Sequence, residues 1–113
     1  MPHMRIMRLR PYVRAMASLQ VDELGMRRIE TEIASAPSAY PIIRGLRGVR
    51  KARFALPGRG KSGGGRVVYY LAISAEVILM IYAYPKNAKD DLNSADRRAV
   101  LAAVEMALKE LKR

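Results

Sequence analysis

The segment from Ile33 to Ala75 holds eight basic residues and contains neither aspartate nor glutamate. The eight basic residues are Arg44, Arg47, Arg50, Lys51, Arg53, Arg59, Lys61 and Arg66. The whole chain carries a net charge of +11, so this one segment holds most of the excess. Because a field of one sign repels itself, such a bias indicates a polyanion as the partner, and nucleic acids and anionic membranes are the commonest polyanions.

The alternation of residues 49–56 predicts a strand with one cationic face. Lys51 and Arg53 share a side with Val49, while Arg50 points with the apolar residues of the other side. Arg66 begins the next expected strand. Like charges on neighbouring strands destabilise a sheet, and a bound phosphate would relieve that cost. We therefore expect the strands and the connection between them to form an anion-binding cradle.

That connection, residues 57–65, is glycine-rich and carries Arg59 and Lys61. It contains Gly-Lys-Ser, but a nucleotide-binding P-loop also needs an earlier glycine at the position of Ala55 and a helix after the lysine. A strand, rather than that helix, is expected after the lysine. The alternatives are a plain flexible hairpin and a cationic arm whose backbone approaches phosphate closely, and we favour the arm.

Tyrosine is the main aromatic residue near this segment. Tyr69 and Tyr70 are consecutive, so only one of them can face the cationic side, and core packing is the ordinary role for either. Tyr84 ends its strand beside Pro85, Lys86 and Asn87. There it could stack on a base or donate a hydrogen bond to a phosphate.

Composition narrows the class of protein. At 113 residues and 50% hydrophobic, the chain is expected to form one domain over 1–113 with a real core. It has no cysteine and one histidine, so we expect no metal site and no cofactor. No apolar run approaches a membrane span and no signal peptide is evident, which makes a cytoplasmic location the expectation.

An α+β domain is expected to position these residues. The expected elements are a strand over 4–10, a short helix over 12–19, an amphipathic helix over 21–35, strands over 49–56, 66–74 and 77–84, and a final helix capped by Ser94. The order is β-α-α-β-β-β-α. The last three strands should form an antiparallel meander, and 77–84 should be a central strand of the sheet that is buried on both faces.

Four stretches together resemble the RelE superfamily and, more narrowly, its HigB-like toxins of type II toxin–antitoxin systems. They are residues 48–54 (GVRKARF), 57–64 (PGRGKSGG), 66–70 (RVVYY) and the group Tyr84, Lys86, Asn87, Asp91 and Leu92. The resemblance implies two N-terminal helices packed on a small antiparallel sheet. It also implies an enzyme, a metal-independent endoribonuclease that cleaves mRNA on the ribosome, and a cognate antitoxin that silences it in a hetero-oligomer.

Such cleavage uses the ribose 2′-hydroxyl to attack the adjacent phosphate, and this chain offers residues for each part of that step. Arg53 and Arg66 are candidates for the phosphate clamp, because a guanidinium suits the charge that develops there. Lys51 and Lys86 are candidates for proton transfer, and Tyr84 is a candidate for orienting the substrate. The residues expected to bind the RNA backbone are Arg50, Arg59, Lys61 and Asn87.

Four other functions remain open at this point. The chain could be a non-catalytic RNA- or DNA-binding module, or an inactive toxin homologue. A DNA-binding regulator is less favoured, because the charge falls on strands and a loop rather than on a recognition helix. A membrane-surface role is weaker still, because the basic segment forms no amphipathic helix.

Overall fold

The computed structural model describes residues 4–58, 64–86 and 91–112, and it confirms the α+β class. The elements are β1 (Arg5–Arg8), α1 (Arg10–Ser18), α2 (Glu23–Ser35), β2 (Arg50–Phe54), β3 (Gly65–Ala72), a 3₁₀ turn η2 (Ile73–Ala75), β4 (Val77–Pro85) and α3 (Ser94–Leu111). Their order is the predicted one. Three predicted phosphate-binding residues, Arg59, Lys61 and Asn87, lie outside the described residues.

The strands form one sheet in the order β1-β4-β3-β2. The antiparallel meander of β2, β3 and β4 is as predicted, and β4 lies in the centre, buried along most of its length. One detail differs from the expected antiparallel sheet, because β1 runs parallel to β4 from Arg5 opposite Val77 to Arg8 opposite Met80. A parallel pair needs a long crossover connection, and the two helices with the β2–β3 hairpin supply it.

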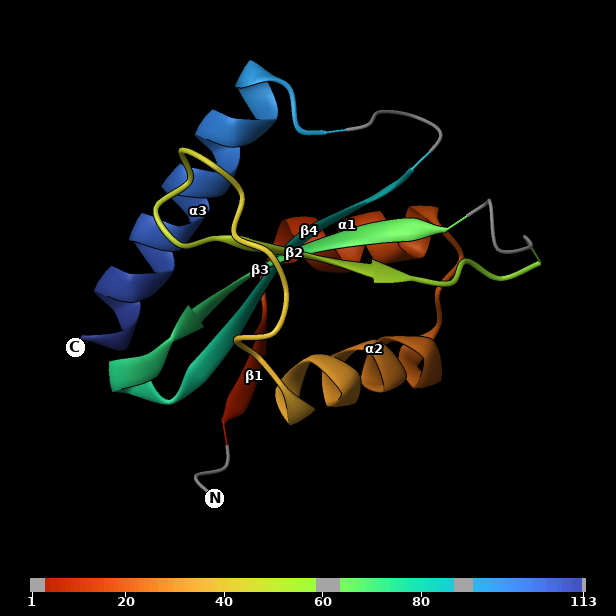
Figure 1. Cartoon of the computed structure of the whole chain (residues 1–113), viewed down its shortest axis with the longest axis horizontal. Coiled ribbons are helices and arrows are strands. Elements are labelled where there is room, and N and C mark those ends of the chain that lie inside the picture. The colour runs from red at the N-terminus through yellow and green to blue at the C-terminus, as the bar shows by residue number, and fades with distance from the viewer. Residues whose placement is uncertain (1–3, 59–63, 87–90, 113) are drawn as a thin grey trace.

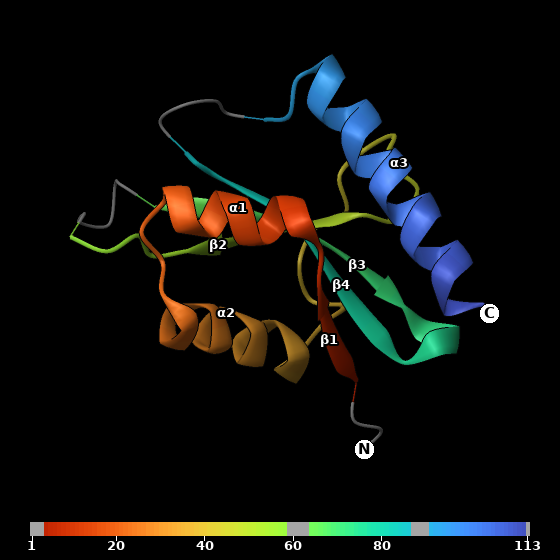
Figure 2. The ribbon, with the colours of Figure 1, turned by 180° about the vertical axis from the view of Figure 1, so that it is seen from behind.

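Helices cover both faces of the sheet (Figures 1 and 2). On one face α1 and α2 bury Tyr12, Met16 and Ile33 against Ile78 and Met80 of β4. On the other face α3 packs against Val68, Leu79 and Ile81, together with the buried residues of the loop before β2. None of the helices that the structure describes combines the length and apolar character that crossing a bilayer requires.

Local chemistry sets where the elements begin and end. The first strand stops at Arg8, earlier than expected, because Pro11 lies in the first turn of α1, where its missing N–H costs no hydrogen bond. Asp22 caps α2, because its side chain accepts a hydrogen bond from the Gly25 N–H at 2.8 Å. Asn93 caps α3, not Ser94, because Asn93 and Asp96 form a reciprocal capping box.

A hydrogen-bonded ion cluster joins the N-terminal elements. Arg8 of β1 donates to Glu30 of α2 through Nε at 2.8 Å and to Glu23 through Nη1 at 2.6 Å. The Tyr12 hydroxyl of α1 donates to the same Glu30 at 2.8 Å. The hydrogen bonds to Glu23 and Glu30 raise the pKa of Arg8, and the hydrogen bond from Arg8 lowers the pKa of Glu23 to about 2. Arg8 is therefore engaged inside the fold and does not contribute to the free cationic surface.

Candidate functional site

Pairing of β2 with β3 brings the predicted arginines together. Arg53 lies directly opposite Arg66, and Arg66 lies opposite Tyr84 on its other side. Arg53 is exposed at the edge of the sheet, while Arg66 is buried, with 9% of its surface accessible. Like charges on directly opposite residues of a strand pair repel, so the arrangement favours an anion beside Arg53 and Arg66.

A cleft of about 640 Å³ lies beside this pair. Its lining residues are Glu32, Tyr40, Pro41, Lys51, Arg53, Arg66 and Lys86. Four of these seven are basic residues predicted from the sequence, and they come from β2, β3 and the end of β4. We call this hollow the cationic cleft. Its charge and size suit a phosphate group with the sugar attached to it.

The glycines at the start of β3 have a packing role at this site. Phe54 lies opposite Gly65, and a Cβ on Gly65 would come within 2.5 Å of the Phe54 ring. A Cβ on Gly64 would come within 3.2 Å of the Phe54 carbonyl oxygen. The Lys86 N–H donates to the Gly64 carbonyl at 3.0 Å, which fixes the end of β4 beside β3. These two glycines thus allow the strand ends that carry Arg53, Arg66 and Lys86 to meet.

Tyr84 lies behind the cleft rather than on its wall. Only 2% of its surface is accessible, and its ring stacks on Tyr82 with centroids 6.1 Å apart. Burial, and next the nearby Asp91 carboxylate, raise the pKa of Tyr84 to about 12. The ring is too deeply buried to offer a face to a base, which disfavours the stacking role, whereas a hydrogen bond from Tyr84 to a phosphate stays a prediction.

Arg50 belongs to the other face of β2, as the strand alternation indicated. Its Nη1 donates to the carbonyls of Tyr40 at 2.7 Å and of Ser38 at 3.3 Å. It is absent from the residues that line the cationic cleft. The structure therefore gives Arg50 a role in holding the loop between α2 and β2, whereas phosphate binding by its side chain stays a prediction.

Sequence reasoning missed three residues at the site. Asp91 comes from the connection before α3, and its Oδ1 lies 3.9 Å from the Lys51 ammonium. Glu32 of α2 and Tyr40 of the following loop line the cleft itself. The absence of acids from 33–75 drew attention to the cations but could not show that acids from outside the segment fold back onto them. Asp91 appeared only as part of the family resemblance.

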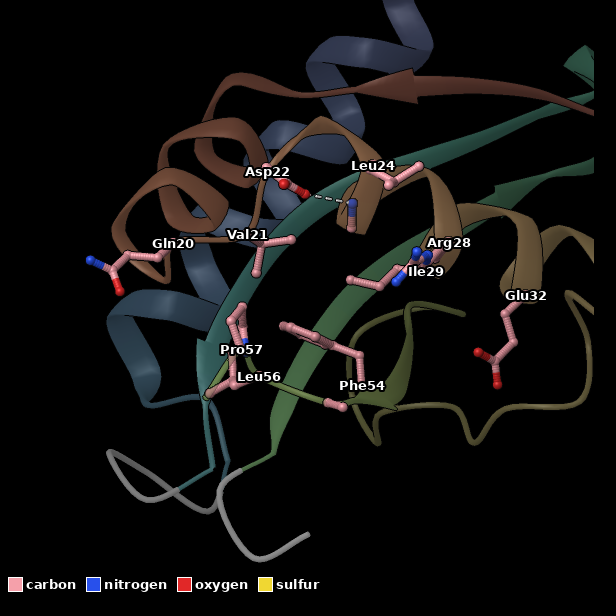
Figure 3. Close-up of a pocket in the computed structure, with 12 residues that line it drawn as sticks. Gln20, Val21, Asp22, Leu24, Arg28, Ile29, Glu32, Phe54, Leu56 and Pro57 are labelled. Atoms are coloured by element: carbon pink, nitrogen blue, oxygen red, sulfur yellow. Dashed lines mark hydrogen bonds between the residues drawn. The ribbon is translucent and has the colours of Figure 1, made fainter. Parts of the chain in front are cut away.

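A second pocket, of about 520 Å³, lies between α2 and the end of β2 (Figure 3). Its wall is largely apolar, with Leu24, Ile29, Phe54 and Leu56 around the hollow. It shares Glu32 with the cationic cleft, but it contains none of the predicted site residues. Its lining lacks the concentration of positive charge that marks the cleft.

A match to a family model shows which protein family the chain belongs to. The model for the RelE toxin of the RelE/RelB toxin–antitoxin system matches residues 4–112. The chain belongs to this toxin family. Membership confirms the predicted superfamily, while the narrower HigB-like resemblance stays a prediction. It makes the chain a toxin of a toxin–antitoxin system and implies a RelB-type antitoxin as its partner.

A solved structure supports the fold. The E. coli toxin RelE, determined as a double arginine-to-alanine mutant in the free state, matches with a TM-score of 0.56 and 16% sequence identity. The match covers 92% of this chain and 97% of the E. coli toxin. At this identity the likeness establishes the RelE fold and leaves the roles of individual side chains to be argued from the cleft.

Proposed function

We propose that this RelE-family chain is a ribosome-dependent endoribonuclease that cleaves mRNA and so inhibits translation. The observation that carries the proposal is the convergence of Lys51, Arg53, Arg66 and Lys86 on one cleft. A toxin that acts on RNA needs a site that holds the phosphodiester and stabilises the charge that develops on it. The cationic cleft supplies this chemistry from side chains alone.

In the proposed reaction the 2′-oxygen of a ribose attacks the adjacent phosphorus and the bond to the 5′-oxygen breaks. The products are a 2′,3′-cyclic phosphate and a 5′-hydroxyl. Arg53 and Arg66 hold the phosphate oxygens, because guanidinium groups present several donors and stay charged. One lysine of the pair Lys51 and Lys86 accepts the 2′-hydroxyl proton and the other protonates the leaving oxygen. Asp91 holds the Lys51 ammonium at one end of the cleft.

Dependence on the ribosome follows from the weakness of this proton-transfer set. Among the described residues that line the cleft there is no histidine, and the carboxylate in that lining, Glu32, belongs to α2 rather than to the strands. If the ribosome aligned the 2′-oxygen, the phosphorus and the 5′-oxygen, this alignment would supply much of the rate that weak proton transfer does not. The proposed cytoplasmic mRNA substrate would be presented in this way, while basic residues beyond the cleft contact ribosomal RNA.

The proposed antitoxin interaction uses the same surface. A RelB-type partner that covers the cleft would need acidic or amphipathic segments there, because charge complementarity determines which surfaces associate. The resulting toxin–antitoxin hetero-oligomer would not cleave RNA, because the antitoxin would occlude the cationic cleft.

The test is transcript-end mapping after brief expression, paired with cleavage of ribosome-bound mRNA by the purified protein. Arg66→Ala should lower cleavage at least a hundredfold, the scale of losing a transition-state donor. Because Arg66 is buried, Arg53→Ala on the exposed edge provides a second variant, and Arg14→Ala on α1 provides a matched control that should cleave normally. Full cleavage by folded Arg53→Ala and Arg66→Ala proteins would refute the proposed clamp, and RNA binding without any cleavage would favour a non-catalytic module.

A further inference from the structure

We propose that the ring of Tyr40 is the stacking surface for a nucleobase of the strand whose phosphates occupy the cationic cleft. Tyr40 is the one aromatic residue among the described residues that line the cleft. Tyr40 is half-buried and lies on the loop between α2 and β2. The inference rests on the proposed RNA-binding function and adds the site for the base.

Tyr40 has the partial exposure that stacking requires. A base needs an accessible ring face, and Tyr84, the aromatic residue that the sequence favoured, is 2% exposed and already stacked on Tyr82. Stacking of a base on a tyrosine ring adds affinity to that of the phosphate contacts. It does so for any nucleotide sequence, because every base has a π-face. One ring beside four cations is the combination that single-strand sites commonly use.

The surrounding residues fix the Tyr40 ring before any ligand arrives. Tyr69 meets it edge to face, with centroids 6.3 Å apart and planes at 84°. The Tyr69 hydroxyl donates to the Pro37 carbonyl at 2.6 Å, which ties the same loop to β3. A braced ring loses little conformational freedom on binding, so more of the stacking energy appears as affinity.

The backbone on both sides of the ring is also held. The Arg50 guanidinium donates to the Tyr40 carbonyl at 2.7 Å, and the Lys51 N–H donates to the Pro41 carbonyl at 3.0 Å. Ile42 forms a β-bridge with Arg50. These bonds attach the loop to the outer edge of β2, the strand that carries Lys51 and Arg53. The distance between the ring and the cations is therefore set by β2 itself, as a site for a base next to its phosphate requires.

The test uses two single-stranded probes that lack the 2′-hydroxyl and so are not cleaved. One is a deoxyadenosine hexamer, and the other is the same phosphate backbone with every base absent. Wild-type protein should bind the base-containing probe about tenfold more tightly than the abasic probe, and Tyr40→Ala should lose this difference while keeping its affinity for the abasic probe. Tyr40→Phe, which keeps the ring, should bind both probes within about twofold of wild type.

Two further variants guard against a structural effect. Tyr40→Leu fills similar space without a π-face and should behave as Tyr40→Ala. Ile42→Ala changes an exposed apolar residue of the same loop, 57% accessible, that does not line the cleft, and it should behave as wild type.

Equal loss of affinity for both probes, or an unchanged preference for bases in Tyr40→Ala, would overturn the inference. Because no cleavage is measured, the result stands apart from the proposed function. A Tyr40-dependent preference for bases in a protein that never cuts mRNA would sink the nuclease and keep the stacking site.

Discussion

At the scale of single residues, the Arg53–Arg66 pair lowers the stability of the fold and favours the binding of an anion. Arg53 and Arg66 are directly opposite each other in β2 and β3, so their like charges repel when no anion is present. Arg53→Glu should replace repulsion with attraction and raise the free energy of unfolding by about 0.5 kcal/mol, while it abolishes RNA binding. Urea unfolding measures the first effect, with Arg53→Gln as an intermediate that removes charge without reversing it. A less stable Arg53→Glu protein would show that the two arginines do not oppose each other in the free fold.

Residue types and the alternation of side chains along the strands predicted several of the residues around Arg53 and Arg66. They could not predict how deeply each side chain is buried. Alternation along 49–56 correctly separated Arg50 from Lys51 and Arg53. The same alternation cannot reveal how deep a side chain lies, so it could not show that Tyr84 is too deeply buried to stack on a base. Tyr40 precedes β2 in a loop without periodicity, and its place on the cleft depends on the turn that returns the chain to the sheet edge.

At the scale of elements, the ion cluster around Glu30 determines how α1 and α2 sit on the sheet. Glu30 is 5% exposed and accepts from Arg8 of β1 and Tyr12 of α1. Glu30→Ala leaves both donors without that partner, so it should lower the free energy of unfolding by about 3 kcal/mol. Chemical denaturation checks this value, and Glu23→Ala, at the exposed end of the cluster, should cost much less. A loss below about 1 kcal/mol for Glu30→Ala would mean that apolar packing alone holds these helices.

The elements themselves followed from local patterns more readily than their pairing did. Periodicity and capping residues predicted each helix and strand in order, with ends that moved by a few residues. The parallel pairing of β1 with β4 was not expected, because β1 is four residues long and its partner follows it by about seventy positions. The place of β1 is defined only once β2, β3 and β4 have formed the meander, because the meander leaves one edge of β4 open for β1 to pair with.

At the scale of the whole molecule, a net charge of +11 predicts how binding responds to salt. Each phosphate that a cation neutralises releases counterions, and for single strands the logarithm of affinity falls by about 0.7 per phosphate for each tenfold rise in salt. If the four cations of the cleft each take one phosphate, the deoxyadenosine hexamer should show a slope of about −3. Lys86→Ala should reduce the steepness by about 0.7, and Arg14→Ala, which removes a charge away from the cleft, should leave it unchanged. If Arg14→Ala reduced the steepness as much as Lys86→Ala does, the binding site would be the whole basic surface and not the cationic cleft, and the side chains proposed to act on the phosphate would not be distinguished from other surface cations.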